Sequence, residues 1–186
     1  MTREMNLPFE YERLSLGEFG GATSAFDGAR VAILPIPLDR TTTYVPGTRS
    51  GPHEILVASS RLELWDEETG TDVHSIGICT LPQMEFPFAT MEEVMKEIRR
   101  VVTEIVTRDK FPVILGGEHS ITAPVVAALA SRHRGLSVLQ IDAHADLRDS
   151  HMGTPHNHAC VMRRVLEYAR TTQVGIRSLS TEEATA

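Results

Sequence analysis

The chain has 186 residues, 41% hydrophobic and 23% charged, a composition typical of one soluble globular domain. Its formal net charge of -7 argues against nucleic acid or an anionic membrane as the main partner, because those surfaces recruit clustered Lys and Arg. A cationic substrate fits this charge better. The first residues lack the apolar segment of a signal peptide, and no later stretch is long enough to span a bilayer. We therefore expect a cytoplasmic protein.

The two cysteines, Cys79 and Cys160, are far apart and lack CxxC spacing. The positions of the two cysteines therefore indicate neither a disulfide framework nor a zinc ribbon. We expect both to be reduced thiols.

We expect residues 1–28 to form an irregular lead-in within a single domain that covers residues 1–186. The lead-in is followed by short apolar runs without polar alternation, at residues 31–34, 113–115, 136–141 and 173–176. Such runs indicate strands that are buried on both faces, as in a parallel sheet covered by helices.

Helical patterns separate these runs. The clearest covers residues 90–108, where Thr90 and Glu93 have the spacing of a capping box. A second helix is predicted from Ile121 or Thr122 to about His133, with Pro124 in its first turn, and two more over residues 52–65 and 159–169. The alternation predicts a three-layer α/β/α sandwich with a mainly parallel sheet. In such folds ligands gather at the carboxyl ends of the strands.

Strong metal ligands follow the run that ends at Ile141. Asp142, His144 and Asp146 occupy every second position, and alternate side chains of an extended backbone point to the same side. Oxygen and imidazole donors without a nearby thiolate favour manganese over zinc. Taken alone, this pattern is more often a polar turn after a strand than a metal site.

A second cluster, Gly116-Gly117-Glu118-His119-Ser120, follows the run that ends at Leu115. The paired glycines permit a close backbone approach and would place His119 at the mouth of the crevice, with Glu118 orienting it. Alone, this segment could be a strand-to-helix turn in which His119 caps backbone groups. Two such clusters at the edge of one sheet favour a metal site.

GGEHS at residues 116–120 and DAHADLRD at residues 142–149 closely resemble two signature motifs of the arginase and agmatinase ureohydrolase family. The resemblance extends over residues 31–180. It includes PGTRSGP at 46–52, HACVMRR at 158–164 and QVGIRS at 173–178.

The resemblance implies two Mn²⁺ ions. His119, Asp142 and Asp146 would hold one, while Asp142 would bridge to a second that is also held by His144. The ions would share a hydroxide that attacks the guanidinium carbon. His158 is the residue that the family pattern suggests for proton transfer or substrate contact, a task suited to imidazole near neutral pH. Spacing alone leaves His151 and His156 as alternatives, and a surface-loop role open for all three.

The sequence departs from the family at its carboxyl end. A later family motif with two further aspartates does not occur in these residues, so we expect a C-terminally incomplete arginase-like fold and a weakly bound second ion. An open sheet edge would also favour association or poor solubility.

The resemblance implies an agmatinase, which would convert agmatine to urea and putrescine in polyamine biosynthesis. Guanidinobutyrate, guanidinopropionate, arginine and formimidoylglutamate are alternative substrates. A second hypothesis is an inactive remnant that acts only in metal binding or subunit association, and a third is another binuclear metallohydrolase such as a phosphoesterase. The family commonly forms trimers or hexamers, so a homo-oligomer is expected.

Overall fold

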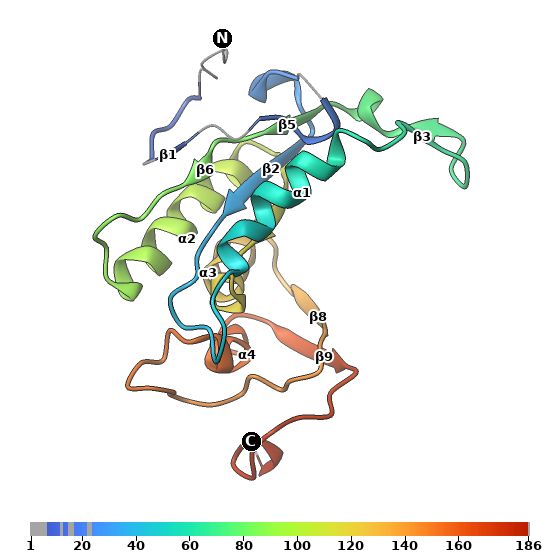
Figure 1. Ribbon diagram of the computed structural model, residues 1–186. Helices are drawn as coiled ribbons and strands as arrows, with labels where there is room; N and C mark the ends of the chain where they lie inside the picture. The colour runs from blue at the N-terminus through green and yellow to red at the C-terminus, as the bar shows by residue number, and fades with distance from the viewer. Residues whose placement is uncertain (1–6, 12, 15–16, 22–23, 186) are drawn as a thin grey trace. The chain divides into compact units, whose positions relative to one another are not determined.

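The computed structural model describes residues 7–11, 13–14, 17–21 and 24–185. Its helices and parallel strands have the α/β character that the sequence predicts (Figure 1). The chain divides into two compact units, and the single domain over residues 1–186 stays a prediction. The first unit comprises Met1–Asp39, Pro46–Pro87 and Glu104–Gly117, and the second comprises Arg40–Val45, Phe88–Thr103 and Glu118–Ala186.

The first unit is built on a three-stranded parallel sheet. Its central strand, β2 (Val31–Ile36), lies between β5 (Ile78–Thr80) and β7 (Phe111–Gly116). Five consecutive residues of β2, from 32 to 36, are buried. The apolar runs at 31–34 and 113–115 therefore mark true strands, each slightly longer than predicted.

Helix α1 (Gly51–Ser59) packs against β2 and β7 and is shorter than the predicted helix over residues 52–65 (Figure 1). The hydroxyls of Ser59 and Ser60 donate to the carbonyls of Leu56 (2.7 Å) and Val57 (2.8 Å), and the chain then turns. Such local bonds from serine compete with helix propagation. Residues 65–72 instead form a small antiparallel hairpin of β3 (Trp65–Asp66) and β4 (Thr71–Asp72).

The remaining elements of the first unit are short. The strand β1 (Arg13–Leu14) pairs antiparallel with β6 (Gln83–Met84). Where residues 1–28 are described, they contain only β1 and two 3-10 helices, so the lead-in is mostly irregular. The 3-10 helices of this unit are η1 (Phe19–Gly21), η2 (Phe26–Gly28), η3 (Thr48–Ser50) and η4 (Val73–Ile76).

Helix α2 (Met91–Thr107) starts with the predicted capping box. The Glu93 carboxylate accepts the Thr90 amide at 2.7 Å, and the Glu93 amide donates to the Thr90 hydroxyl at 3.3 Å. These reciprocal bonds satisfy backbone donors that the first helical turn leaves free. The helix buries a continuous apolar stripe made of Val94, Ile98, Val101, Val102 and Ile105.

The second unit contains a parallel pair of strands, β8 (Ser137–Ile141) and β9 (Arg170–Val174), with Ser137 opposite Arg170. The two helices of its core are α3 (Thr122–Arg132), as predicted, and α4 (Val161–Val165). Helix α4 is shorter than the predicted helix over 159–169. After Val165 the chain continues in turns, in which the amide of Tyr168 donates to the carbonyl of Val165, three residues earlier. The core consists of Val126, Val161, Met162, Val165 and Ala169, with Val138 of β8 packed against it.

One expectation about β8 is wrong. Leu139 is 62% exposed and Ile141 is 80% exposed, whereas Gln140 between them is buried. Only the face of β8 that carries Val138 packs on the helical core. Strand β8 is therefore not buried on both faces.

Within the described part of the chain, no helix is long and apolar enough to cross a membrane.

Candidate metal centre

The two predicted ligand clusters directly follow strands. After β7, Gly117 and Glu118 lead into the 3-10 helix η5 (His119–Ile121). Gly117 is required by packing, because a β-carbon there would lie 2.2 Å from the carbonyl oxygen of Leu38. This is the close backbone approach that the paired glycines predict. Asp142 directly follows β8.

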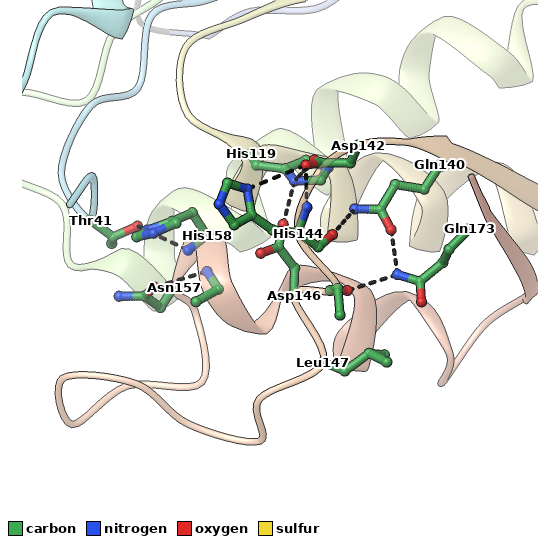
Figure 2. A network of polar contacts seen from close by, with 12 residues as sticks. Thr41, His119, Gln140, Asp142, His144, Asp146, Leu147, Asn157, His158 and Gln173 are labelled. Carbon is green, nitrogen blue, oxygen red and sulfur yellow. Dashed lines mark hydrogen bonds and ion pairs between the residues drawn. The ribbon is translucent and has the colours of Figure 1, made fainter. Parts of the chain in front are cut away.

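Three predicted ligands converge in the second unit (Figure 2). The Nδ1 atom of His119 lies 2.9 Å from a carboxylate oxygen of Asp146 and 3.6 Å from one of Asp142. One ligand atom from each of the three residues lies within 4.8 Å of the other two. Two carboxylates and an imidazole in this arrangement are a donor set that suits a hard or borderline divalent cation.

His144 lies beside this cluster rather than in it. Its Nδ1 atom is 3.5 Å from Oδ1 of Asp142, and its side chain is 64% exposed. The two oxygens of Asp142 therefore face different histidines, Oδ2 toward His119 and Oδ1 toward His144. A carboxylate that faces two ligand groups in this way can bridge two cations.

Backbone hydrogen bonds hold the segment that carries the aspartates. The amide of Asp142 donates to the carbonyl of Val174 at 3.0 Å, and His144 forms a parallel bridge with Ser178. Asp146 has a φ of 53°, and its carbonyl accepts the amide of Met162 at 2.9 Å. A left-handed conformation is uncommon outside glycine but is tolerated by aspartate. The turn after Asp146 is thus fixed against the start of α4.

The surroundings of Asp142 lower the pKa of its carboxyl. Burial raises the pKa of its carboxyl, but the amide of His144 and the charge of His119 outweigh burial and leave the pKa below its ordinary value. Asp146 is only 8% exposed, and a buried carboxylate requires a compensating partner. Both features fit a site for a cation.

His158 starts the 3-10 helix η6 (His158–Cys160), which Asn157 caps by accepting the amide of Ala159 at 3.0 Å. The ring nitrogens of His158 face two threonines. Nδ1 lies 3.3 Å from the hydroxyl of Thr41 (Figure 2), and Nε2 lies 3.2 Å from that of Thr43. The amide of Arg163, close behind in α4, donates to the carbonyl of Asp146 at 3.3 Å. The segment that carries His158 is therefore tied to the segment that carries the ligands.

The two alternative histidines are placed differently. The ring of His151 lies edge-on to that of His158, with 6.4 Å between centroids. His156 instead lines a separate cavity of about 240 Å³, together with Glu92, Lys96 and residues of α3. His151 therefore lies next to His158, and His156 lines a different cavity.

Glu118 does not take the predicted role of orienting His119. Its carboxylate accepts the amides of Arg40 and Thr41, both at 2.6 Å, and the hydroxyls of Thr41 and Ser120. Glu118 therefore organises the segment around Thr41. Sequence reasoning missed Thr41 because it lies 77 positions from Glu118 and no local pattern links the two.

Comparison with known proteins places these motifs in a family. The chain matches the arginase family over residues 29–186, and it belongs to that family. It is 42% identical to the N(1)-aminopropylagmatine ureohydrolase of Synechocystis sp. over 173 residues, which are 88% of this chain and 56% of the relative. It is 32% identical to the agmatinase of Bacillus cereus, over 86% of this chain and 56% of that protein.

The fold of the chain is also similar to that of a solved structure. The agmatine ureohydrolase of Thermoplasma volcanium superposes with a TM-score of 0.85 and 35% identity, over 93% of this chain and 59% of that one. The arginase-like fold expected from the sequence is confirmed. The chain spans about half the length of the curated relatives that it matches.

Proposed function

We propose that this chain carries the metal-binding part of a ureohydrolase that cleaves a guanidino compound, agmatine in the first instance, to urea and an amine, putrescine. The convergence of His119, Asp142 and Asp146 within 4.8 Å carries the proposal. The agmatinases and N(1)-aminopropylagmatine ureohydrolases among its relatives support it.

His119, Asp142 and Asp146 would hold one divalent ion, and Asp142 with His144 would contribute to a second. We propose Mn²⁺ because the donors are carboxylate oxygens and imidazole nitrogens, without a thiolate. When bound, such ions lower the pKa of a water molecule so that it can act as a nucleophile at neutral pH. His119, Asp142 and Asp146 would position the ion and balance its charge, since both aspartates face the imidazole of His119.

We assign His158 to proton transfer. The guanidinium carbon is stabilised by resonance, and the departing amine must gain a proton for the reaction to proceed. Imidazole suits this task near neutral pH. The hydrogen bonds of His158 to Thr41 and Thr43 hold its ring in one orientation, which an effective proton donor needs.

The substrate has a second candidate. The relative with 42% identity is named for N(1)-aminopropylagmatine, in which the agmatine amine carries a further aminopropyl group. Both candidates are cationic, as the net charge of -7 favours. Either one places the reaction in polyamine biosynthesis, and we propose a cytoplasmic homo-oligomer, a trimer or hexamer, as its setting.

A non-catalytic role, in metal binding or subunit association alone, is the competing proposal. It is favoured by the exposed Leu139 and Ile141 of β8, because large exposed apolar side chains on one sheet face mark contact surfaces.

The test measures manganese stoichiometry and product release on the same purified sample. The substrates are agmatine, N(1)-aminopropylagmatine, guanidinobutyrate, arginine and formimidoylglutamate, with formamide assayed instead of urea for the last. Asp142→Ala should abolish both metal binding and turnover, whereas Asp149→Ala, in an exposed ion pair with Arg164, should preserve both. Metal binding without turnover of any substrate would support the non-catalytic role. Turnover that survives Asp142→Ala would refute the proposed site.

A further inference from the structure

The hydrogen bonds of Glu118 leave it no spare acceptor site. Glu118 is 3% exposed, and its carboxylate accepts two backbone amides and two hydroxyls. An ionised carboxylate only accepts hydrogen bonds, so the hydroxyls of Thr41 and Ser120 must both direct their hydrogens toward it. The bond from Thr41, at 2.6 Å, is short, as expected of a hydroxyl that donates to a charged oxygen.

Thr41 has only one hydroxyl hydrogen, and Glu118 takes it. The same oxygen lies 3.1 Å from the backbone amide of His158 and 3.3 Å from Nδ1 of its ring. Toward both nitrogens it can therefore act only as an acceptor, through its two lone pairs. The amide of His158 carries a hydrogen in any case. Nδ1 must carry one as well if this contact is a hydrogen bond.

We propose that Glu118 and Thr41 fix the tautomer of His158, with the proton on Nδ1 and the lone pair on Nε2. The direction of each bond follows from the one before it: Glu118 orients the Thr41 hydroxyl, and Thr41 selects the Nδ1–H form of the ring. Nε2 is then an acceptor, and the hydroxyl of Thr43, 3.2 Å away, can donate to it. Thr41 itself is 9% exposed, so water does not readily replace it in this chain of bonds.

The catalytic consequence rests on the proposed function. If His158 transfers a proton, Nε2 is the atom that takes it up and releases it, while Nδ1 stays bonded to Thr41. Glu118 and Thr41 are thus positioning residues: they act through His158 and touch no reacting atom.

The test reads the tautomer directly. Protein labelled with ¹⁵N-histidine is examined by long-range ¹H–¹⁵N correlation at about pH 8, above the ordinary pKa of histidine, so that the ring is neutral. The nitrogen without a proton resonates far downfield of the protonated one, and the loss of signals in His158→Asn identifies the ring. In the unsubstituted chain we expect the downfield signal from Nε2.

Two substitutions should move this signal in different ways. In Glu118→Gln, the amide nitrogen faces Thr41 and donates to it, which turns the Thr41 hydroxyl toward Nδ1 and should transfer the downfield signal from Nε2 to Nδ1. Thr41→Val removes the acceptor and should leave a mixture of tautomers. Thr41→Ser restores the hydroxyl and should restore the original pattern, which a merely structural loss would not do.

An Nε2–H tautomer in the unsubstituted chain would overturn the proposal, as would an unchanged spectrum in Thr41→Val. If Glu118→Gln fails to fold, the comparison of Thr41→Val with Thr41→Ser decides. The spectrum needs neither metal nor substrate. A failure of the proposed hydrolysis would therefore leave the assigned tautomer standing, and the reverse also holds.

Discussion

Nδ1 of His119 lies 2.9 Å from Oδ2 of Asp146, although 27 positions separate the two residues in the sequence. The contact joins the segment after β7 to the segment after β8 through two candidate ligands. Asp146→Asn keeps the shape of the side chain but removes its charge, and we expect it to weaken Mn²⁺ binding. Loss of a partner that only orients a ligand costs about 10-fold to 100-fold in affinity, so loss of a ligand's negative charge should cost at least about tenfold.

Titration calorimetry with Mn²⁺ measures this effect. Asp149→Asn is the matched control, because Asp149 is exposed and pairs with Arg164 rather than with a ligand. Equal affinities of the two variants would remove Asp146 from the ligand set.

Glu183 should stabilise the segment after Asp146 in a manner that depends on pH. It is 7% exposed, and its carboxylate accepts the amides of Leu147 at 2.9 Å and Ser180 at 2.7 Å. Burial raises the pKa of Glu183, but these bonds outweigh burial and hold the pKa below its ordinary value of 4.5. Because the folded pKa is lowered, this stabilisation is fully present above pH 4.5 and is lost as the pH falls through the lowered value.

Glu183→Gln should therefore lower the free energy of unfolding by about 1–3 kcal/mol at neutral pH, because a buried amide donor loses its charged acceptor. The difference from the unsubstituted chain should shrink in acid. Urea denaturation at several pH values measures it, with Glu182→Gln at the exposed neighbouring position as the control. A difference that is independent of pH would exclude ionised Glu183 as its cause.

The capping box of α2 gives a separate stability prediction. Thr90→Ala removes the side-chain acceptor for the Glu93 amide and should cost about 1 kcal/mol. The midpoint of urea unfolding reports this loss. Since Thr90 and Glu93 cap the helix together, Glu93→Ala should cost less stability in the Thr90→Ala variant than in the unsubstituted chain. Strict additivity of the two substitutions would mean that they do not act as one cap.

Both thiols should react slowly in the native protein. Cys79 is 1% exposed and Cys160 is fully buried. Burial raises the pKa of both thiols, that of Cys79 to about 11, and the thiolate is the reactive form. A thiol reagent at pH 8 should modify neither cysteine within the time in which it modifies both in denaturant. Rapid reaction of the native chain would contradict the buried placement.

The order of strands and helices could be read from the sequence because it depends on local patterns. Unbroken apolar runs locate β2 and β7, and the spacing of Thr90 and Glu93 locates the start of α2. The candidate ligands were also predictable, since His119 and Asp142 follow strands whose ends attract ligands in this class of fold.

Features set by distant partners could not be predicted in this way. The role of Glu118 depends on Thr41, 77 positions away, and that of Glu183 depends on Leu147, 36 positions away. The exposure of Leu139 was missed because an apolar run shows that a strand can be buried and does not show what covers each face. The helix predicted over residues 52–65 ends at Ser59, where serine hydroxyls bond to the preceding carbonyls, and Trp65 instead begins a hairpin with β4.

We expect a divalent cation to bind between His119, Asp142 and Asp146. Anomalous diffraction from a crystal of the full chain grown with Mn²⁺, recorded at the manganese edge, tests this binding most directly. We predict a peak that is bounded by Nδ1 of His119 and by carboxylate oxygens of both aspartates, and that is absent from Asp142→Ala. A peak elsewhere, or no peak at saturating Mn²⁺, would contradict the account.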